Sequence, residues 1–507
     1  MIKNDEYYAP FMGEPLAMSI GLNPLGMRTA SEQIFTALLP GMNVVTLRIR
    51  YYSFYCWLLQ RFYTTRERAT LSDFRRYIRT SELLLALIHV ACGRANGVPG
   101  TQRASSILSA NEEVIDFLQD AIPDDKDTKS YWDGANGILG SYYVVALQEL
   151  NLIKPLADDI RMYNITPHNN TTVSGEDMAE AFGKSVAPVA DLFESSAQMG
   201  RVSHAELLEM APYFQTHEMG NSEERRLLLR VLLQADRAMT ECPTHFRRGT
   251  MRLLLRFLGN KQPDCFSEID FAQYVYQLFA QGQDHSIEAM GWYAYHLNDR
   301  RQYASLCIFN ELLTILSQSA APGQWESIAS LTAQLAKEVV SALDCDTLTV
   351  AEALQRWPSI PAPKQKMAQA FYNLLDDYRQ NEGFRDTQRR IKEAGIAVTN
   401  DALAAFADIE SHRGEPLTQY VQRFLTEKII YNHYAEAMRK YCLTGVATHK
   451  LAIESGRVKG LALYEPSHST PRVGTLYEFA TDLALVKEAK LTPLGMETLT
   501  HLEDENA

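Results

Sequence analysis

The stretch that most constrains the fold lies between residues 46 and 63. It carries seven aromatic side chains from Tyr51 onward, and its apolar residues recur at helical spacing behind Thr46, a suitable N-cap. A helix that is apolar nearly all round is normally buried. The pattern predicts a buried central helix over residues 46–63, preceded by a helix over 31–39 and a turn at Pro40-Gly41.

Two arginines stand out in this stretch. Arg48 and Arg50 would lie in the first turn of the central helix, where the helix dipole disfavours cations. Arginine beside buried aromatic residues usually holds an anion. The anion could be an internal carboxylate, a phosphate or nucleic-acid backbone, or a group on a partner protein. Alanine at both positions should impair function, and an internal carboxylate predicts a loss of a few kcal/mol of stability as well.

The composition is that of a folded chain with several domains. The 507 residues predict two to four domains, and 46% hydrophobic and 22% charged residues fit a folded, soluble protein. The net charge of −13 argues against coating nucleic acid with the whole surface, so any contact should be a local patch. No apolar run could span a bilayer and no signal peptide opens the chain, which predicts a cytoplasmic protein without membrane contact.

The order of elements predicts a mainly α, multi-domain helical protein with winged-helix-like units near residues 131–183 and at the C-terminus. A helix over 137–150, two short extended pieces and a helix capped by Ser174 give the first unit. The tripeptide Ile165-Thr166-Pro167 recurs as Leu491-Thr492-Pro493 in the same place of the second. We therefore expect the two units to resemble each other.

Composition shifts predict four consecutive domains. These are an N-terminal aromatic and arginine-rich helical domain, a winged-helix-like domain, a helical domain with arginine stripes, and a C-terminal helical domain, over residues 1–125, 126–200, 201–355 and 364–507. Residues 356–363, RWPSIPAP, separate the last two as a predicted linker, because three prolines in six positions exclude regular structure.

Arginines recur at helical spacing in the third of these domains. Arg248, Arg252 and Arg256 would form one stripe along a helix, and Arg226, Arg230 and Arg237 a looser stripe on the helix before it. Such stripes suit backbone phosphates. The simpler alternative is pairing with the 62 acidic residues on a solvated face. The candidate nucleic-acid or partner-binding residues are Arg48, Arg50, Arg226, Arg230, Arg248, Arg252 and Arg256.

Standard catalytic patterns are absent from the sequence. It has no GxGxxG, P-loop, HExxH or GxSxG motif, and its twelve histidines and seven cysteines lack metal-ligand spacing. Glu488-Ala489-Lys490 with Asp482 upstream has the letters of a metal-dependent nuclease, but a chance match is the simpler explanation. We therefore expect no catalytic residue, metal site or cofactor.

The predicted recognition helix, residues 137–150, contains no lysine or arginine. A helix that enters the major groove normally makes several phosphate or base contacts. This disfavours direct reading of DNA and favours a protein–protein role for the winged-helix-like units. Such units at both ends of a helical chain would suit a connector that bridges an ATPase dimer.

One set of residues spans about forty positions near the start of the chain: Pro24-Leu25-Gly26, Leu38-Leu39-Pro40-Gly41, Thr46, Arg48, Arg50-Tyr51-Tyr52, Phe54 and Trp57. In these residues the chain resembles a group of uncharacterised bacterial proteins found in anti-phage defence islands and mobile elements. The resemblance implies a multigene defence system with neighbouring partner proteins. It implies no reaction and no catalytic residue.

The sequence thus predicts a non-enzymatic subunit of a prokaryotic anti-phage or anti-plasmid defence complex. It would bridge other defence-system proteins, such as an ATPase or nuclease subunit, and contact nucleic acid such as DNA. Two alternatives stay open. One is a DNA-binding transcriptional regulator, and the other is a nuclease without a recognisable motif.

Overall fold

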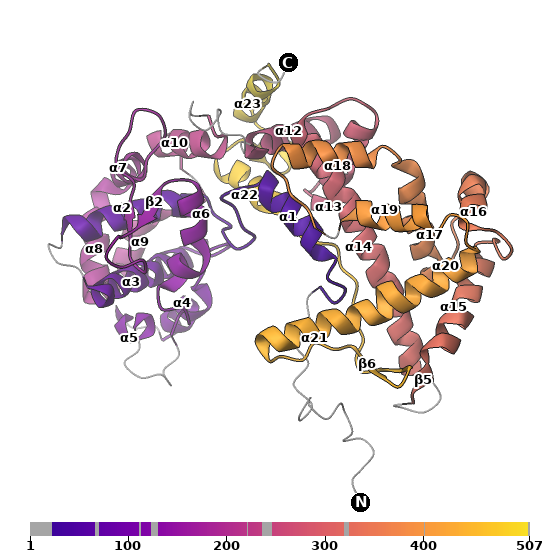
Figure 1. The fold of residues 1–507 in the computed structure, drawn as a ribbon. Helices are drawn as coiled ribbons and strands as arrows, with labels where there is room; N and C mark the ends of the chain where they lie inside the picture. The colour runs from indigo at the N-terminus through magenta and orange to yellow at the C-terminus, as the bar shows by residue number, and fades with distance from the viewer. Residues whose placement is uncertain are drawn as a thin grey trace, which may run out of the picture. The chain divides into compact units, whose positions relative to one another are not determined.

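The computed structural model of the chain describes residues 23–65, 70–110, 113–122, 130–217, 219–220, 222–235, 246–318, 324–399 and 401–504. These residues are mainly helical, and their few short strands form small antiparallel sheets of two or three strands (Figure 1). The predicted mainly α class is therefore confirmed. The finer assignment of winged-helix domains stays a prediction.

The chain forms two compact units rather than four consecutive domains. The first unit combines residues 1–35 with 276–470, and the second combines 36–275 with 471–507. The chain passes from one unit to the other within α1 (Arg28–Leu38), within α13 (Glu268–Ala280) and after Thr470. A division read along the sequence missed this arrangement because it assumes that a domain is one continuous segment.

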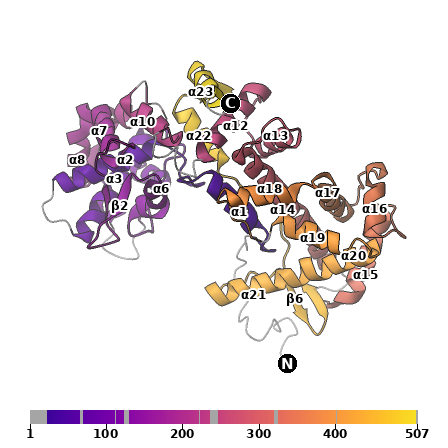
Figure 2. The ribbon, with the colours of Figure 1, turned by 45° about the horizontal axis from the view of Figure 1, so that its top comes forward.

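The second unit is built around α2 (Arg50–Thr64), which is buried along most of its length and packs against α3 and α7. Figures 1 and 2 show α2 among these helices from two directions. The other elements described are α3 (Leu71–Ala91), α4 (Thr101–Leu108), β1 (Val114–Asp116), α5 (Leu118–Ala121), η2 (Leu139–Tyr143), α6 (Val144–Glu149), β2 (Ile153–Pro155), β3 (Tyr163–Ile165), α7 (Gly175–Val186), η3 (Ala187–Val189), α8 (Ala190–Met199), β4 (Arg201–Ser203), α9 (His204–Phe214), α10 (Glu223–Leu232), α12 (Phe246–Lys261), α22 (Val473–Asp482), β8 (Val486–Lys487), β9 (Lys490–Leu491) and α23 (Pro493–Asp504).

The central helix was predicted correctly as buried, but its start was not. It begins at Arg50, whereas Thr46 lies in a preceding turn where its hydroxyl donates to the Asn43 carbonyl at 3.1 Å. Thr46 is fully buried and caps no helix. Arg48 therefore precedes the helix and Arg50 is its first residue. The N-cap prediction failed because threonine can satisfy a turn as well as a helix N-terminus.

Helix, hairpin, helix occurs twice in the second unit. The first hairpin motif is η2–α6, β2–β3 and α7, residues 139–186, and the second is α22, β8–β9 and α23, residues 473–504. In each, a residue with positive φ lies two positions after the end of the helix that precedes the hairpin, Asn151 at 55° and Ala484 at 59°. This left-handed residue closes the helix C-terminus and turns the chain into the hairpin.

The hydrogen bonds of the two hairpin motifs match atom for atom. The amide of Thr166 donates to the Leu152 carbonyl at 3.0 Å, and that of Thr492 donates to the Leu485 carbonyl, also at 3.0 Å. Each threonine hydroxyl in turn accepts from a glycine amide, Gly175 at 2.8 Å and Gly495 at 3.1 Å. A Cβ on either glycine would collide with the carbonyl oxygen of the leucine. The expected likeness of the two segments is therefore real at the level of local geometry.

The first unit is organised around α14 (Ile287–Gln318), a buried helix of 32 residues. Its other elements are β5 (Glu326–Ser327), α15 (Ile328–Ala342), α16 (Val350–Arg356), η4 (Trp357–Ser359), α17 (Lys366–Gln380), α18 (Phe384–Glu393), α19 (Ala402–Ser411), α20 (Leu417–Arg423), η5 (Phe424–Tyr431), α21 (Asn432–Thr444), β6 (Leu451–Glu454) and β7 (Arg457–Gly460). The strands form one sheet in the order β5-β7-β6.

The predicted linker at residues 356–363 is wrong. It lies inside the first unit, where Trp357 is fully buried and Ile360 is 5% exposed. The prolines do prevent a long helix here, and only the short turn η4 forms. Trp357 and Ile360 nevertheless anchor the segment to the core, because burying two large apolar side chains is favourable without regular structure.

Candidate functional site

The stretch that the sequence singled out connects the two hairpin motifs. We call residues 40–52 the bridging segment. On the side of the first motif, the Gly41 amide donates to the Glu149 carboxylate at 2.6 Å, and the Asn43 side-chain amide donates to the Tyr142 carbonyl at 2.8 Å. The ring of Tyr51 stacks on Tyr143 with centroids 5.0 Å apart. These contacts tie the segment to η2 and α6.

The opposite side of the bridging segment binds the second motif. The Arg472 guanidinium donates to the Met42 carbonyl at 2.5 Å, and the Thr475 hydroxyl donates to the Asn43 carbonyl at 3.0 Å. The ring of Tyr52 meets Phe479 of α22 edge-on at 5.7 Å, and it also meets Tyr143 edge-on at 5.9 Å. One aromatic side chain thus touches both hairpin motifs.

Arg48 pairs with α22 of the second motif. It is 5% exposed and donates to Asp482 at 2.8 Å and Glu478 at 3.3 Å. The same Asp482 carboxylate accepts from the Ile49 amide at 3.3 Å, directly before α2 begins. Burial raises the pKa of Asp482 to about 7, while the Arg48 charge acts in the opposite direction. The Asp482 carboxyl group therefore lies at the N-terminus of α2, where the helix dipole favours a negative charge.

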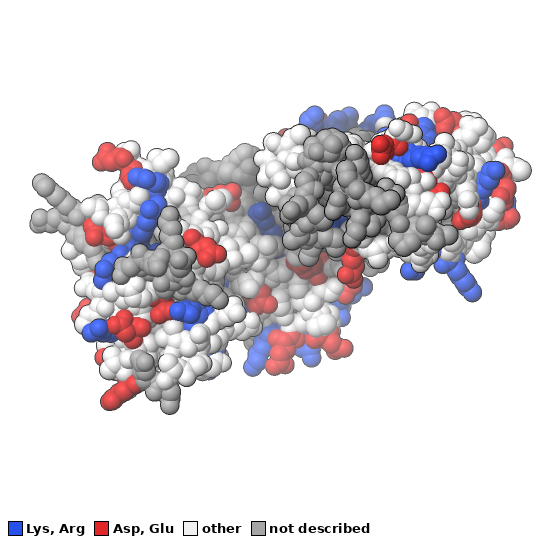
Figure 3. Space-filling view, turned by 90° about the horizontal axis from the view of Figure 1, so that it is seen from below, with Lys and Arg blue, Asp and Glu red and all other residues white. Residues whose placement is uncertain are grey.

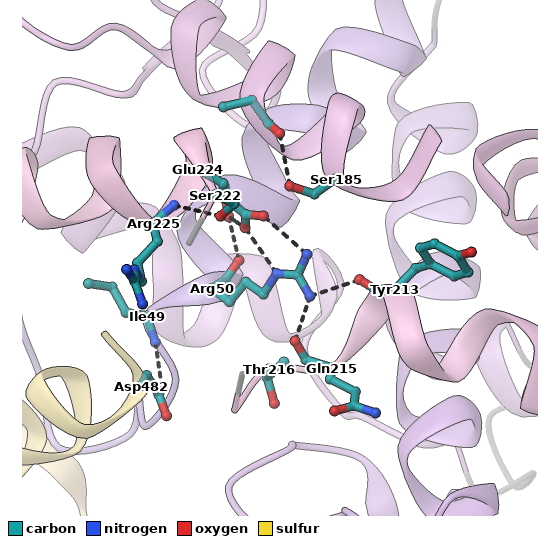
Figure 4. A network of polar contacts seen from close by, with 12 residues as sticks. Ile49, Arg50, Ser185, Tyr213, Gln215, Thr216, Ser222, Glu224, Arg225 and Asp482 are labelled. Carbon is teal, nitrogen blue, oxygen red and sulfur yellow. Dashed lines mark hydrogen bonds and ion pairs between the residues drawn. The ribbon is translucent and has the colours of Figure 1, made fainter. Parts of the chain in front are cut away.

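Arg50 is bound on every side within the second unit (Figure 4). Its Nε and Nη2 donate to the two Glu224 oxygens at 3.0 and 3.1 Å, and Nη1 donates to the Tyr213 and Gln215 carbonyls at 2.8 and 2.6 Å. The guanidinium also lies 5.0 Å from the Phe182 ring centre. Glu224 is 1% exposed and also accepts from the Ser53 hydroxyl at 2.6 Å.

These placements favour one of the three anions considered for Arg48 and Arg50. Both arginines hold internal carboxylates, supplied by Asp482 and Glu224, so neither forms part of a surface for nucleic acid or a partner. A direct binding role would require breaking a buried ion pair. We therefore correct the predicted role of both residues from ligand binding to internal pairing.

A third buried arginine, Arg247, was missed at the sequence level. It is 1% exposed and donates to the carbonyls of Leu232, Val231 and Pro40 at 2.8, 2.6 and 2.5 Å. It thereby closes the C-terminus of α10 and secures the turn that starts the bridging segment. Burial lowers its pKa to about 10, so it remains charged at neutral pH. The neighbouring Arg248 was predicted as a binding residue instead, because spacing alone does not show which of two adjacent arginines faces inward.

The remaining predicted arginines fall into two groups. Arg252 is buried and Arg256 about one-quarter exposed, and both face Glu503 of α23, at 3.4 and 3.8 Å. Arg248 is half-buried, which lowers its pKa. The stripe 248–252–256 is therefore largely internal, which corrects its predicted surface role. Arg226 and Arg230 are exposed on α10, and Arg237 lies outside the described residues.

The nuclease-like triplet does not assemble. Asp482 is buried against Arg48, whereas Glu488 is exposed in the turn between β8 and β9 and Lys490 is exposed at the start of β9. Within the described ranges, no group of three or more His, Cys, Asp or Glu side chains could hold a metal ion. His168 lies 2.6 Å from Asp177, and His468 lies 2.6 Å from Asp299.

Charge on the visible surface is mixed. On the face shown in Figure 3, Lys and Arg are interspersed with Asp and Glu over the residues drawn in colour. Among the helices that the structure describes, none is long and apolar enough to cross a bilayer. Comparison with known proteins finds no matching family model, no matching curated protein and no matching solved structure.

Proposed function

We propose that the protein is a non-enzymatic connector subunit of a prokaryotic anti-phage or anti-plasmid defence complex, acting in the cytoplasm. It binds partner proteins, such as an ATPase or nuclease subunit, through its two hairpin motifs. The observation that carries this proposal is the repeated motif, fixed twice to one bridging segment. Two like elements held together by buried contacts suit a protein that binds two copies of a partner.

The residues of the resemblance support the same proposal. Arg48 and Tyr52 contact the hairpin motifs, and Arg50 holds the start of α2 against Glu224 of α10. Residues that hold parts of one protein together, rather than a substrate, are what a scaffold requires. Nucleic-acid contact is then a secondary role, and the exposed Arg226 and Arg230 of α10 are the predicted residues suited to it.

The two alternatives have less support. A transcriptional regulator needs a recognition helix that reaches phosphates or bases, and η2–α6 carries no basic residue. A nuclease needs acids gathered around a metal, and Asp482 is engaged by Arg48 instead.

The test is purification of the tagged full-length protein from its native operon, with co-purifying proteins identified and their stoichiometry measured. We expect a partner at fixed stoichiometry. Val145 on α6 and Met496 on α23 are exposed apolar residues of the first and second motif, at 65% and 53%. Val145→Glu and Met496→Glu should each reduce recovery of the partner at least tenfold, because a charge in an apolar contact must be desolvated.

The matched control is Val114→Glu on β1, outside both motifs, where the side chain is 55% exposed. It should leave recovery unchanged. Arg226→Glu with Arg230→Glu should remove co-purifying nucleic acid but keep the protein partner. A lone protein that cleaves nucleic acid when a divalent metal is added would overturn the connector proposal in favour of the nuclease.

A further inference from the structure

A cavity of about 210 Å³ lies within the first unit. Its walls come from α14, α17, α19, α20, η5 and the start of α21. Figures 1 and 2 show α14, α17, α19 and α20 close together. Met27, Leu297 and Leu374 are among the apolar residues that line it, and Arg301 and Lys428 are its two basic residues. An enclosed, mostly apolar space with a few polar groups is the usual form of a small-molecule site.

The two acids that line the cavity already have cationic partners. Asp377 is 9% exposed, and both its oxygens lie close to Arg300 Nε, at 2.9 and 3.0 Å. Asp408 has Arg423 Nη1 and Lys428 Nζ at 3.5 Å each. A cationic ligand would therefore have to displace protein cations from both acids.

The cations around Asp408 pair with it only at long distances. The two 3.5 Å separations exceed the roughly 2.7–2.9 Å of a strong charge-assisted hydrogen bond. Arg423 Nε and Nη2 are buried without a hydrogen-bond partner, and Nη2 approaches Glu415 only to 3.6 Å. Burial lowers the pKa of Arg301 to about 10, so this guanidinium remains positive at neutral pH. Arg301 and Lys428, the two cations that line the cavity, supply positive charge for the anionic group of a ligand.

The backbone supports a site here as well. Phe424 and Lys428 reach the cavity from η5, a π-helix of eight residues between α20 and α21. π-helical turns are rare and occur frequently at functional sites, because the wider turn changes which side chains share a face. Phe424 and Lys428 of this segment both line the cavity.

We propose that this cavity binds a small organic anion. Its apolar body packs against Met27, Leu297 and Leu374, and its anionic group, a carboxylate or phosphate, faces Arg301 and Lys428. The volume suits a metabolite smaller than a nucleotide. The inference does not depend on the hairpin motifs, which belong to the second unit, and it adds a ligand-binding role to the proposed connector.

Isothermal titration of the full-length protein tests this with four probes. Phenylacetate and phenyl phosphate carry an apolar body with a carboxylate or a phosphate, whereas benzyl alcohol lacks the charge and inorganic phosphate lacks the body. We expect one of the two aromatic anions to bind saturably, at least tenfold more tightly than benzyl alcohol and inorganic phosphate. The better anion identifies the head group. Absence of saturable binding by both aromatic anions overturns the proposal.

Three variants locate the binding. Lys428→Gln removes a lining cation whose side chain is 42% exposed, and it should weaken binding of the better anion at least fivefold. Ala405→Phe should fill the cavity and abolish binding while thermal unfolding still shows a folded protein. Lys366→Gln, at a surface lysine that is 80% exposed, should change nothing. Equal affinity in all three variants would place the anion elsewhere and overturn the proposal.

Discussion

At the scale of single residues, the second unit contains buried arginines that use their donors in different ways. Arg50 binds one carboxylate with two nitrogens and two carbonyls with the third, while Arg247 binds only carbonyls. A guanidinium can do this because its five donors lie in one plane and remain protonated when buried. Removing either arginine leaves buried acceptors without a donor.

Replacing Arg50 tests how much the buried pair contributes. Arg50→Met should lower the free energy of unfolding by about 3–5 kcal/mol, because Glu224 would remain as an unpaired buried charge. Adding Glu224→Leu should recover part of the loss, which a double-mutant cycle by urea denaturation would measure. Arg201→Met is the control: Arg201 is 64% exposed and its partner Asp116 is 49% exposed, so the loss should be about 0–1 kcal/mol. Equal losses at the two arginines would contradict a structural role for Arg50.

At the scale of elements, α22 is held by a carboxyl group at each end. Glu268 accepts from the Gly474 amide at 2.7 Å at the start of the helix, which has no side-chain cap of its own. Asp482 ends the helix against Arg48. Burial raises the pKa of both Glu268 and Asp482 to about 7. The attachment of this helix should therefore depend on pH near neutrality.

The sign of this dependence follows from the raised pKa. Glu268 would titrate near about 4.3 in the unfolded chain, so its protonated form is favoured by folding. Its contribution is fully present below the unfolded pKa and is lost as pH rises through about 7. We expect the melting temperature of the wild type, relative to Glu268→Gln, to fall between pH 5 and 8.

Glu206 provides the control of opposite sign. Its carboxylate accepts from the Ser203 amide and hydroxyl at the start of α9, which lowers its pKa. The wild type relative to Glu206→Gln should therefore lose stability as pH falls below about 4.3 rather than as it rises. Parallel pH profiles for the two variants would contradict the assignment for Glu268.

At the scale of the whole molecule, each unit depends on distant parts of the chain. The C-terminal α22 and α23 supply Asp482 to Arg48 and Glu503 to Arg252 within the second unit. Residues 25 and 27 likewise join the core of the first unit beside α14. Each unit is complete only when its separate segments are present.

Two fragments test this dependence. Residues 36–275 alone should be unstable, because Arg48 and Arg252 would lose their carboxylates. The same fragment joined to residues 471–507 by a flexible linker of about ten residues should unfold cooperatively, since the Glu268–Gly474 contact brings the two ends near each other. Circular dichroism melts would compare them. Equal stability of the two fragments would show that the C-terminal segment is dispensable for the second unit.

Sequence reasoning identified the local features well and the long-range partners poorly. The buried aromatic helix, the hairpins and the helix capped by Ser174 follow from spacing over a few residues, and all are present. The predicted linker at Trp357 failed because proline excludes regular structure but not burial. The prediction that the stripe of Arg248, Arg252 and Arg256 forms a binding surface was wrong. Helical spacing shows that residues share a face, but it does not show whether that face meets solvent or α23.

The sequence by itself determined that Arg48 and Arg50 needed anions, because cations beside buried aromatic rings cannot remain uncompensated. Only the tertiary structure decided that the anions are Asp482 and Glu224, which lie 434 and 174 positions further along the chain. Local spacing carries information over one or two helical turns. Which carboxylate meets which arginine depends on the packing of whole helices, and the same holds for the joint between the two hairpin motifs.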